Sequence, residues 1–277
     1  MSRMTAAEGD RKPSWIKTLG ERFRSVGKPQ PEDRRVDSGE AAPTVYCIGD
    51  IHGHLDLLVG LESLIKDDMA RDPSQSALLV YLGDYVDRGP ASSKVIAHLL
   101  SRDTLCHQEV FLRGNHEQVL LDALKSPAAM ELLCSFGGLD TLVSYGLRPR
   151  LPLTPEALAD MCALFEAALP PEHLAFFQRT RHSFETATHF FAHAGINPGI
   201  SLGMQKPADL MWIREPFLKS TRRFEKIVVH GHTPVPQAEI RANRINLDTG
   251  AYATGRLSCG VIRGNSCRII SSAPEPV

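Results

Sequence analysis

The sequence predicts an α/β fold in which short strands alternate with helices. Two observations lead to this prediction. From Thr44 onward, short apolar runs of the kind found in strands buried on both faces recur along the chain. Between these runs lie longer stretches with the pattern of helices, and such alternation is typical of a sheet that carries helices on its faces. With 43% hydrophobic residues, the chain of 277 residues can bury a core of this kind.

The expected elements follow one another along the chain. The first five strands are predicted at 45–48, 77–82, 109–112, 189–192 and 226–229. Helices are predicted at 55–71, 92–100, 117–125 and 155–169. Three later runs, 245–248, 257–262 and 267–271, are predicted as closing antiparallel strands. The stretch 126–185 lacks strand signals, which predicts a helical insert over one edge of the sheet.

Residues 1–43 differ from the rest of the chain, because they are rich in charged residues, proline, glycine and serine. This composition predicts a flexible tail before a folded domain over 44–277. Within the tail, Ile16, Leu19, Phe23 and Val26 fall at helical spacing. One alternative is a helix that docks on a partner or a membrane surface. We favour a short helix that frays or packs on the domain, because isolated helices of this length are weak.

Charge and hydropathy exclude several classes of protein. The formal net charge of -1 and the pI of about 6.8 argue against a nucleic-acid-binding protein. No apolar run approaches the length of a membrane span, and the polar N-terminus lacks the apolar segment of a signal peptide. We therefore expect a cytoplasmic protein. The six cysteines form no Cys-x-x-Cys pair and are expected to be free thiols without a chemical role.

Polar residues follow each of the first five predicted strands. The five motifs are GDIHGH at 49–54, GDYVDRGP at 83–90, RGNHE at 113–117, HAG at 193–195 and HGHTP at 230–234. Ligands of open α/β sheets bind beyond the carboxyl ends of the strands, so these motifs are expected to converge. A single Asp or His at a strand end is usually a turn residue or a cap. Five such ends together indicate a shared site.

The residue types indicate a metal site. Carboxylate, imidazole and amide ligands suit Mn, Fe, Zn or similar ions. Side chains two apart in an extended segment point to the same side, so Asp50 and His52 are expected to hold one ion. Asp84 is expected to bridge to a second ion, completed by Asn115, His193 and His232. Two divalent ions, with Mn²⁺ favoured, would clamp a phosphate and lower the pKa of a bridging water.

Three further residues suggest catalytic roles. Arg88 can fork onto the oxygens of a phosphate. His116 follows the predicted ligand Asn115, so we expect its side chain to point away from the metals toward a leaving group. Asp87 is the expected carboxylate partner that keeps His116 protonated as a general acid.

These motifs resemble those of the phosphoprotein phosphatase family of metallophosphoesterases, in the same order, from about Thr44 to Ile262. The resemblance implies the calcineurin-like fold, which is a central β-sandwich flanked by helices, and a dinuclear metal site formed by the six ligands named above. It identifies His116 as the general acid and Asp87 as its partner. It also implies that Arg88, Arg214 and Asn115 bind the substrate phosphate, with Arg214 lying in the shorter motif LMWIRE at 210–215.

The resemblance implies a serine/threonine protein phosphatase, in which a metal-bridging hydroxide attacks the phosphorus of a phosphorylated protein or peptide. The segment 136–146, FGGLDTLVSYG, is similar to the bacterial and phage branch of the family. A related branch hydrolyses diadenosine tetraphosphate with nearly the same metal motifs. The RGNHE and HGHTP motifs favour the protein phosphatases over that alternative. A binding scaffold with an unused site is a third alternative, against which the intact set of ligand residues argues.

Overall fold

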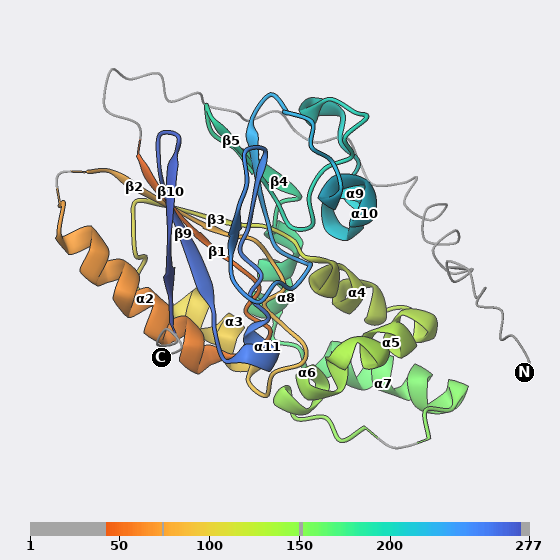
Figure 1. Cartoon of the computed structure of the whole chain (residues 1–277). Helices are drawn as coiled ribbons and strands as arrows, with labels where there is room; N and C mark the ends of the chain where they lie inside the picture. Colours follow the sequence, from red (N-terminus) through yellow and green to blue (C-terminus); the bar gives the residue numbers. More distant parts are fainter. Residues whose placement is uncertain (1–42, 74, 150–151, 273–277) are drawn as a thin grey trace, which may run out of the picture. The chain divides into compact units, whose positions relative to one another are not determined.

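A computed structural model describes residues 43–73, 75–149 and 152–272 (Figure 1). All of these residues belong to one compact unit, Glu40–Val277. Apart from Pro43, the predicted tail over 1–43 lies outside the described residues, and so does the helix expected around 16–26. The division into a tail and a domain over 44–277 therefore stays a prediction.

The first of two five-stranded sheets has the strand order β10-β9-β1-β2-β3. Its members are β1 (Thr44–Ile48), β2 (Ala77–Tyr81), β3 (Gln108–Phe111), β9 (Ser258–Arg263) and β10 (Ser266–Ser271). The first three strands are parallel, because helices α2 (Leu55–Ala70) and α3 (Ser92–Ser101) return the chain between them. The hairpin β9–β10 adds antiparallel to β1, as predicted for the two last runs.

The second sheet has the order β4-β5-β6-β8-β7. It contains β4 (Ser183–Glu185), β5 (His189–Ala192), β6 (Ile227–His230), β7 (Glu239–Ile240) and β8 (Arg244–Asn246). The run 245–248 was expected as a closing antiparallel strand, which is correct for its pairing with β7 and wrong for its pairing with β6. The chain reverses direction between β6 and β7 and again between β7 and β8. Strand β8 therefore runs parallel to β6 and antiparallel to the short β7.

The two sheets pack against each other, and the alternation of side chains along β1 shows how. Val45 and Cys47 point into an apolar layer that also contains Phe191, Val229 and Ile245 of the second sheet. The intervening side chains of β1, Tyr46 and Ile48, point to the other face and pack with the helices. The outer face of the second sheet is covered in turn by α9 (Pro207–Trp212) and α10 (Glu215–Leu218), which are joined to it by an apolar cluster. The predicted α/β sandwich flanked by helices is confirmed.

In its described residues, the stretch expected as a helical insert contains four α-helices and the short segment η2, which is kinked at Gly137. They are α5 (Pro127–Leu133), η2 (Cys134–Gly138), α6 (Leu139–Ser144), α7 (Pro155–Ala168) and α8 (Pro171–Arg179). These helices extend the layer formed by α2, α3 and α4 (Asn115–Ala123), with which they share one apolar core (Figure 1). A bridge between Leu112 and Arg181 joins the end of the insert to the β3 edge of the first sheet. The last three residues of the predicted insert belong to β4.

Two short elements complete the described part of the chain, the 3₁₀ turn η3 (Leu202–Met204) and helix α11 (Ala251–Thr254). None of the helices in the described ranges is long and apolar enough to cross a membrane. The six cysteines are free thiols, as expected.

Candidate active site

The five polar motifs meet at the carboxyl ends of β1, β2, β3, β5 and β6. The structure buries the predicted metal ligands there, together with the predicted His–Asp pair. These residues are Asp50, His52, Asp84, Asp87, Asn115, His116, His193 and His232. Because a buried charge is costly without a partner, so many buried ionisable groups indicate a site rather than a set of turn residues.

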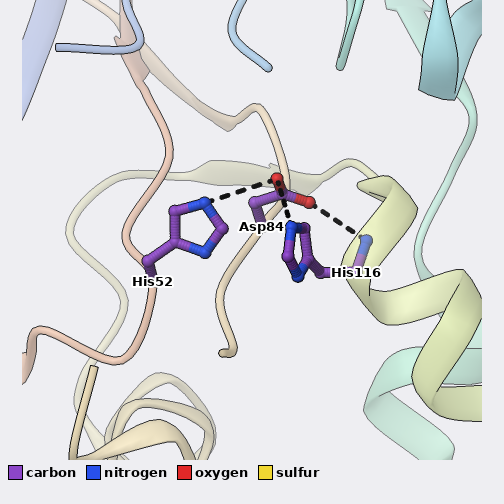
Figure 2. A group of neighbouring side chains, drawn as sticks. All are labelled: His52, Asp84 and His116. Carbon is purple, nitrogen blue, oxygen red and sulfur yellow. Dashed lines mark hydrogen bonds and ion pairs between the residues drawn. The ribbon is translucent and has the colours of Figure 1, made fainter. Parts of the chain in front are cut away.

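Asp84 lies at the centre of the site. Its Oδ2 atom lies 3.6 Å from Nε2 of His52, 3.3 Å from Nε2 of His193 and 3.8 Å from Nε2 of His116. The other oxygen, Oδ1, accepts the backbone N–H of His116 at 3.3 Å. Figure 2 shows His52, from the loop after β1, and His116, from the start of α4, pointing at the same carboxylate. Although burial opposes the charge of Asp84, the imidazoles of His193 and His116 hold its pKa well below the ordinary value.

Backbone carbonyls orient the histidines around Asp84. The Nδ1 atom of His52 lies 2.8 Å from the carbonyl oxygen of Val86, and the Nδ1 atom of His193 lies 3.0 Å from that of Leu82. A hydrogen bond from Nδ1 leaves Nε2 as the free lone pair, which is the usual arrangement of a metal-binding histidine. Burial lowers the pKa of His52 to about 3, so this side chain is neutral and able to bind a cation.

Two groups of candidate metal ligands share Asp84. The first is His52, Asp84 and His116, and the second is Asp84, His193 and His232, with ligand atoms within 4.8 Å of one another in each group. The Oδ1 atom of Asn115 lies 3.0 Å from Nε2 of His193, so it borders the second group. Two clusters that meet at one carboxylate can hold two ions, but the first cluster contains His116, which was expected to point away from the metals, in place of the predicted Asp50.

Asp50 stands outside both groups. Its Oδ2 atom accepts the backbone N–H of His232 at 3.0 Å, whereas its buried Oδ1 atom has no hydrogen-bond partner among the described residues. Burial raises the pKa of Asp50 well above its usual value, and the charges of Asp248 and Asp84 raise it further. A cation would offset this crowding of buried carboxylates, so the unpartnered oxygen fits the prediction that Asp50 binds metal.

Asp248 was not predicted as part of the site. It is buried, and its Oδ1 atom accepts the N–H of Gly250 at 2.9 Å. Burial raises its pKa to about 6 against the effect of that hydrogen bond, and the charge of Asp84 adds to the rise. The available signal was a sixth apolar run, 245–248, that ends in a carboxylate followed by Thr249 and Gly250.

The predicted His116–Asp87 pair is present in the structure. Nδ1 of His116 lies 2.6 Å from Oδ2 of Asp87, and Nε2 lies 3.4 Å from Nη2 of Arg88. Burial opposes protonation of His116, but the Asp84 charge and the Asp87 hydrogen bond outweigh it and raise the pKa above its ordinary value. The raised pKa favours the protonated imidazole, and Nε2 lies beside a guanidinium group, a position that suits donation of a proton near a bound anion.

Arg214 lies beside the second group of candidate ligands. Its Nε atom donates to Nε2 of His232 at 3.2 Å. Three aromatic rings border the same region. The Arg88 guanidinium lies 4.4 Å from the ring centre of Tyr252, while Phe136 and Trp212 lie 5.9 Å apart, near His116 and His232 respectively. The two predicted phosphate-binding arginines thus lie beside different ligand groups, Arg88 next to His116 and Arg214 next to His232.

Backbone strain is concentrated at the site. The non-glycine residues with positive φ are His52, Asp84, Asp87, Arg88 and His232 in the described part of the chain. All five belong to the predicted site, and such strain persists only where the surrounding structure holds it. Two glycines allow the backbone to approach the carboxylates closely. A Cβ on Gly114 would lie 2.0 Å from an oxygen of Asp84, and a Cβ on Gly231 would lie 2.0 Å from an oxygen of Asp50.

Glu117 joins two of the site loops, a role that the sequence did not indicate. Its Oε2 atom accepts the N–H groups of Asp84 at 2.8 Å and of Gly114 at 2.9 Å, and its Oε1 atom accepts the N–H of Tyr85 at 2.8 Å. Burial raises its pKa to about 7, and the charge of Asp84 acts in the same direction. Glu117 therefore fixes the loop that carries Asp84 to the start of α4.

Comparison with known proteins identifies the family. Residues 43–257 match the model of the calcineurin-like phosphoesterases. The chain belongs to this family. A calcineurin-like phosphoesterase is a hydrolase of phosphate esters, and the buried ligand clusters around Asp84 provide its candidate site for divalent metals.

The relatives of this calcineurin-like phosphoesterase include a serine/threonine phosphatase and a bis(5'-nucleosyl)-tetraphosphatase. The chain is 32% identical to serine/threonine-protein phosphatase 1 of Salmonella typhimurium over 79% of this chain and 92% of that protein. It is 26% identical to the asymmetrical bis(5'-nucleosyl)-tetraphosphatase PrpE of Halalkalibacterium halodurans over 76% and 87% of the two chains. A solved structure described as a candidate diadenosine tetraphosphatase shares the fold, with a TM-score of 0.58 and 20% identity over 83% of this chain and 96% of that one.

Replacing Glu117 with Gln is expected to destabilise this phosphoesterase. An amide places an NH₂ group where the carboxylate accepts backbone N–H groups, so at least one buried donor loses its partner, at about 1–3 kcal/mol. Urea unfolding of the metal-free protein measures the difference. Glu166→Gln on the exposed face of α7 is the matched control. An unfolding midpoint for Glu117→Gln equal to that of the control would contradict the proposed role.

Proposed function

We propose that this phosphoesterase removes phosphate from phosphoserine and phosphothreonine in proteins, using two divalent metal ions, with Mn²⁺ favoured. The observation that carries the proposal is the buried His116–Asp87 pair, at 2.6 Å, beside Arg88 and the shared Asp84. Such a pair is needed when the leaving group is an alkoxide, because an alkoxide must receive a proton. The 32% identity to a serine/threonine phosphatase over most of both chains supports the same activity.

The side chains around Asp84 fit two hard or borderline cations. Asp50, His52 and Asp84 would hold the first ion, and Asp84, Asn115, His193 and His232 the second. The unpartnered Oδ1 of Asp50 and the Nε2 atoms that face Asp84 are the donors that such ions need. When bound, the ions supply neutralising charge and lower the pKa of a nearby water.

The remaining residues of the site act on the phosphate and on the leaving group. Arg88 and Arg214 can each donate two hydrogen bonds to phosphate oxygens, and Asn115 can contribute its amide. Asp87 holds Nδ1 of His116, so Nε2 is directed away from Asp87 and into the site. A water oxygen bonds to the phosphorus as the P–O bond to the serine or threonine oxygen breaks, and His116 gives its Nε2 proton to that leaving oxygen. Inorganic phosphate is thus released without a phosphoenzyme.

Hydrolysis of diadenosine tetraphosphate is the second candidate function. Two observations favour it: the 26% identity to PrpE and the fold shared with the diadenosine tetraphosphatase structure. Against it stand the RGNHE motif, which ends in Glu117 where the nucleotide branch is expected to have Asp, and the HGHTP motif.

Removal of divalent metal is expected to abolish activity, and added Mn²⁺ is expected to restore it. The purified full-length chain is treated with a chelator, dialysed, and assayed with and without Mn²⁺ on a phosphoserine peptide and on diadenosine tetraphosphate in parallel. Cleavage of the peptide with little turnover of the dinucleotide supports the proposed function. The reverse result assigns the nucleotide activity. Full activity in the chelator would remove the metals from the proposal.

A further inference from the structure

The segment Cys134–Ser144, here called the η2–α6 segment, packs beneath the dipeptide Asp87–Arg88. It consists of η2, which is kinked at Gly137, and helix α6, and it contributes none of the five polar motifs. The proposed function uses Asp87 and Arg88 but does not explain what holds them in place. Both have positive φ, 70° and 68°, so their conformation requires support from neighbouring structure.

Thr141 makes two hydrogen bonds to Asp87. Its hydroxyl donates to Oδ1 of Asp87 at 2.6 Å and accepts the backbone N–H of Asp87 at 2.8 Å. The hydroxyl also lies 2.9 Å from Oγ of Ser92, which accepts the same backbone N–H at 3.1 Å. Thr141, Ser92 and Asp87 are fully buried, so water cannot replace a lost bond without rearrangement. One carboxylate oxygen of Asp87 is therefore held by Thr141, while the other faces His116.

Gly137 supports the neighbouring arginine. Its carbonyl oxygen accepts the backbone N–H of Arg88 at 3.0 Å. Gly137 has φ of 93°, and a Cβ at this position would lie 2.9 Å from Cγ of Arg88. Glycine is thus required both by the backbone conformation and by the close approach of the arginine stem.

The η2–α6 segment is anchored to the start of α3. The backbone N–H of Ser93 donates to Oγ of Ser144 at 3.0 Å, and Oγ of Ser93 donates to the carbonyl of Ser144 at 2.6 Å. Together with the contact between Thr141 and Ser92, these bonds fix α6 to the helix that follows the Asp87 loop. The anchored segment can therefore hold Asp87 and Arg88 in place.

We propose that the η2–α6 segment is a positioning element of the active site, in which Thr141 orients the Asp87–His116 pair and Gly137 orients Arg88. The inference rests on the proposed function, because it assigns roles in leaving-group protonation and phosphate binding. A hydroxyl that holds Oδ1 prevents rotation of the Asp87 carboxylate, and a fixed carboxylate fixes the ring of His116. Groups that orient a functional side chain in this way typically contribute about 10–100-fold to activity.

Thr141→Val tests the first half of this inference. The variant keeps the shape of the side chain and removes the hydroxyl. We expect kcat/KM on a phosphoserine peptide to fall by about 10–100-fold, with little change on p-nitrophenyl phosphate, because nitrophenolate leaves without a proton. Thr141→Ser, which keeps the hydroxyl, is expected to restore most of the activity. Thr44→Val is the matched control, because Thr44 is buried in β1 and its hydroxyl has no partner in the described part of the chain.

Gly137→Ala tests the second half and does not depend on whether valine is accommodated at position 141. Displacement of Arg88 should raise KM for both substrates by about tenfold or more, since Arg88 contacts the phosphate and not the leaving group. The positioning role of Thr141 would be overturned if Thr141→Val lowered kcat/KM equally on both substrates. It would also be overturned if Thr141→Ser failed to restore activity on the peptide. An unchanged KM in Gly137→Ala would overturn that of Gly137. A wild-type protein that cleaves p-nitrophenyl phosphate but not the phosphoserine peptide would instead refute the proposed function, and L-phosphoserine or another alkyl phosphate would then replace the peptide in these comparisons.

Discussion

Replacing Asp84 with Asn is expected to lower activity by at least about 10³-fold, since charge stabilisation by metal ions is worth several kcal/mol and each 1.36 kcal/mol is tenfold. Asp84 is the residue shared by the two candidate ligand groups, so its loss affects both. The amide also removes the negative charge that three imidazole Nε2 atoms face, at 3.3 to 3.8 Å. We therefore expect the variant to lose bound metal as well as activity, in contrast to a variant that only disturbs the substrate.

The measurement combines kcat/KM on p-nitrophenyl phosphate with elemental analysis of metal per chain. The nitrophenyl substrate removes the need for leaving-group protonation, so the loss reports on the metal site and not on His116. Asp160→Asn, on an exposed turn of α7, is the matched control. Two ions per chain together with wild-type activity in Asp84→Asn would refute the central place given to this carboxylate.

The regular elements could be predicted because their signals are local. The side chains of β1 point alternately into the apolar layer between the two sheets and toward the helices. Both directions are buried, so the run 45–48 is apolar throughout and is easily recognised. Strand β7 escaped prediction because it has only two residues, Glu239 and Ile240, which carry no periodicity. Without β7, the direction of β8 could not be deduced, and the error about its pairing followed.

The residues of the site were predictable where they follow a strand directly. Asp50, Asp84 and His193 each come within three residues of a strand end, so the two packed sheets bring them together. The supporting residues have no such signal. Thr141 contacts Asp87 across 54 residues of sequence, and its position depends on how η2 and α6 pack against α3. A threonine in an amphipathic helix is otherwise unremarkable.

Glu117 shows a further limit of prediction from residue types. It stands in the RGNHE motif, where a glutamate beside candidate ligands could equally be a ligand, a base or a helix-capping residue. The structure shows that both of its oxygens are used by three backbone N–H groups. This arrangement depends on the strained turn that places the N–H of Asp84 near α4, and no spacing rule encodes that turn.

His116→Asn is expected to reduce kcat/KM on a phosphoserine peptide by about 10²–10⁴-fold, the usual contribution of a general acid. Asparagine is neutral, cannot deliver the Nε2 proton and loses the 2.6 Å contact with Asp87. The loss on p-nitrophenyl phosphate should be much smaller, because its leaving group departs as a stable anion. Asp87→Asn should show the same dependence on the leaving group with a smaller loss, because the imidazole remains but is less firmly oriented.

The loss of kcat/KM on the phosphoserine peptide, compared with the loss on p-nitrophenyl phosphate, distinguishes proton donation from metal binding. The distinction matters because His116 is also a member of the first ligand group. If His116 served mainly as a ligand, its replacement would lower activity on both substrates equally and reduce the bound metal, as expected for Asp84→Asn. If it donates the proton, metal content stays at the wild-type level and the alkyl ester alone is strongly affected. His107→Asn, at an exposed histidine, is the matched control. Full activity of His116→Asn on the phosphoserine peptide would refute the general-acid assignment and leave the metal ligands of the proposal intact.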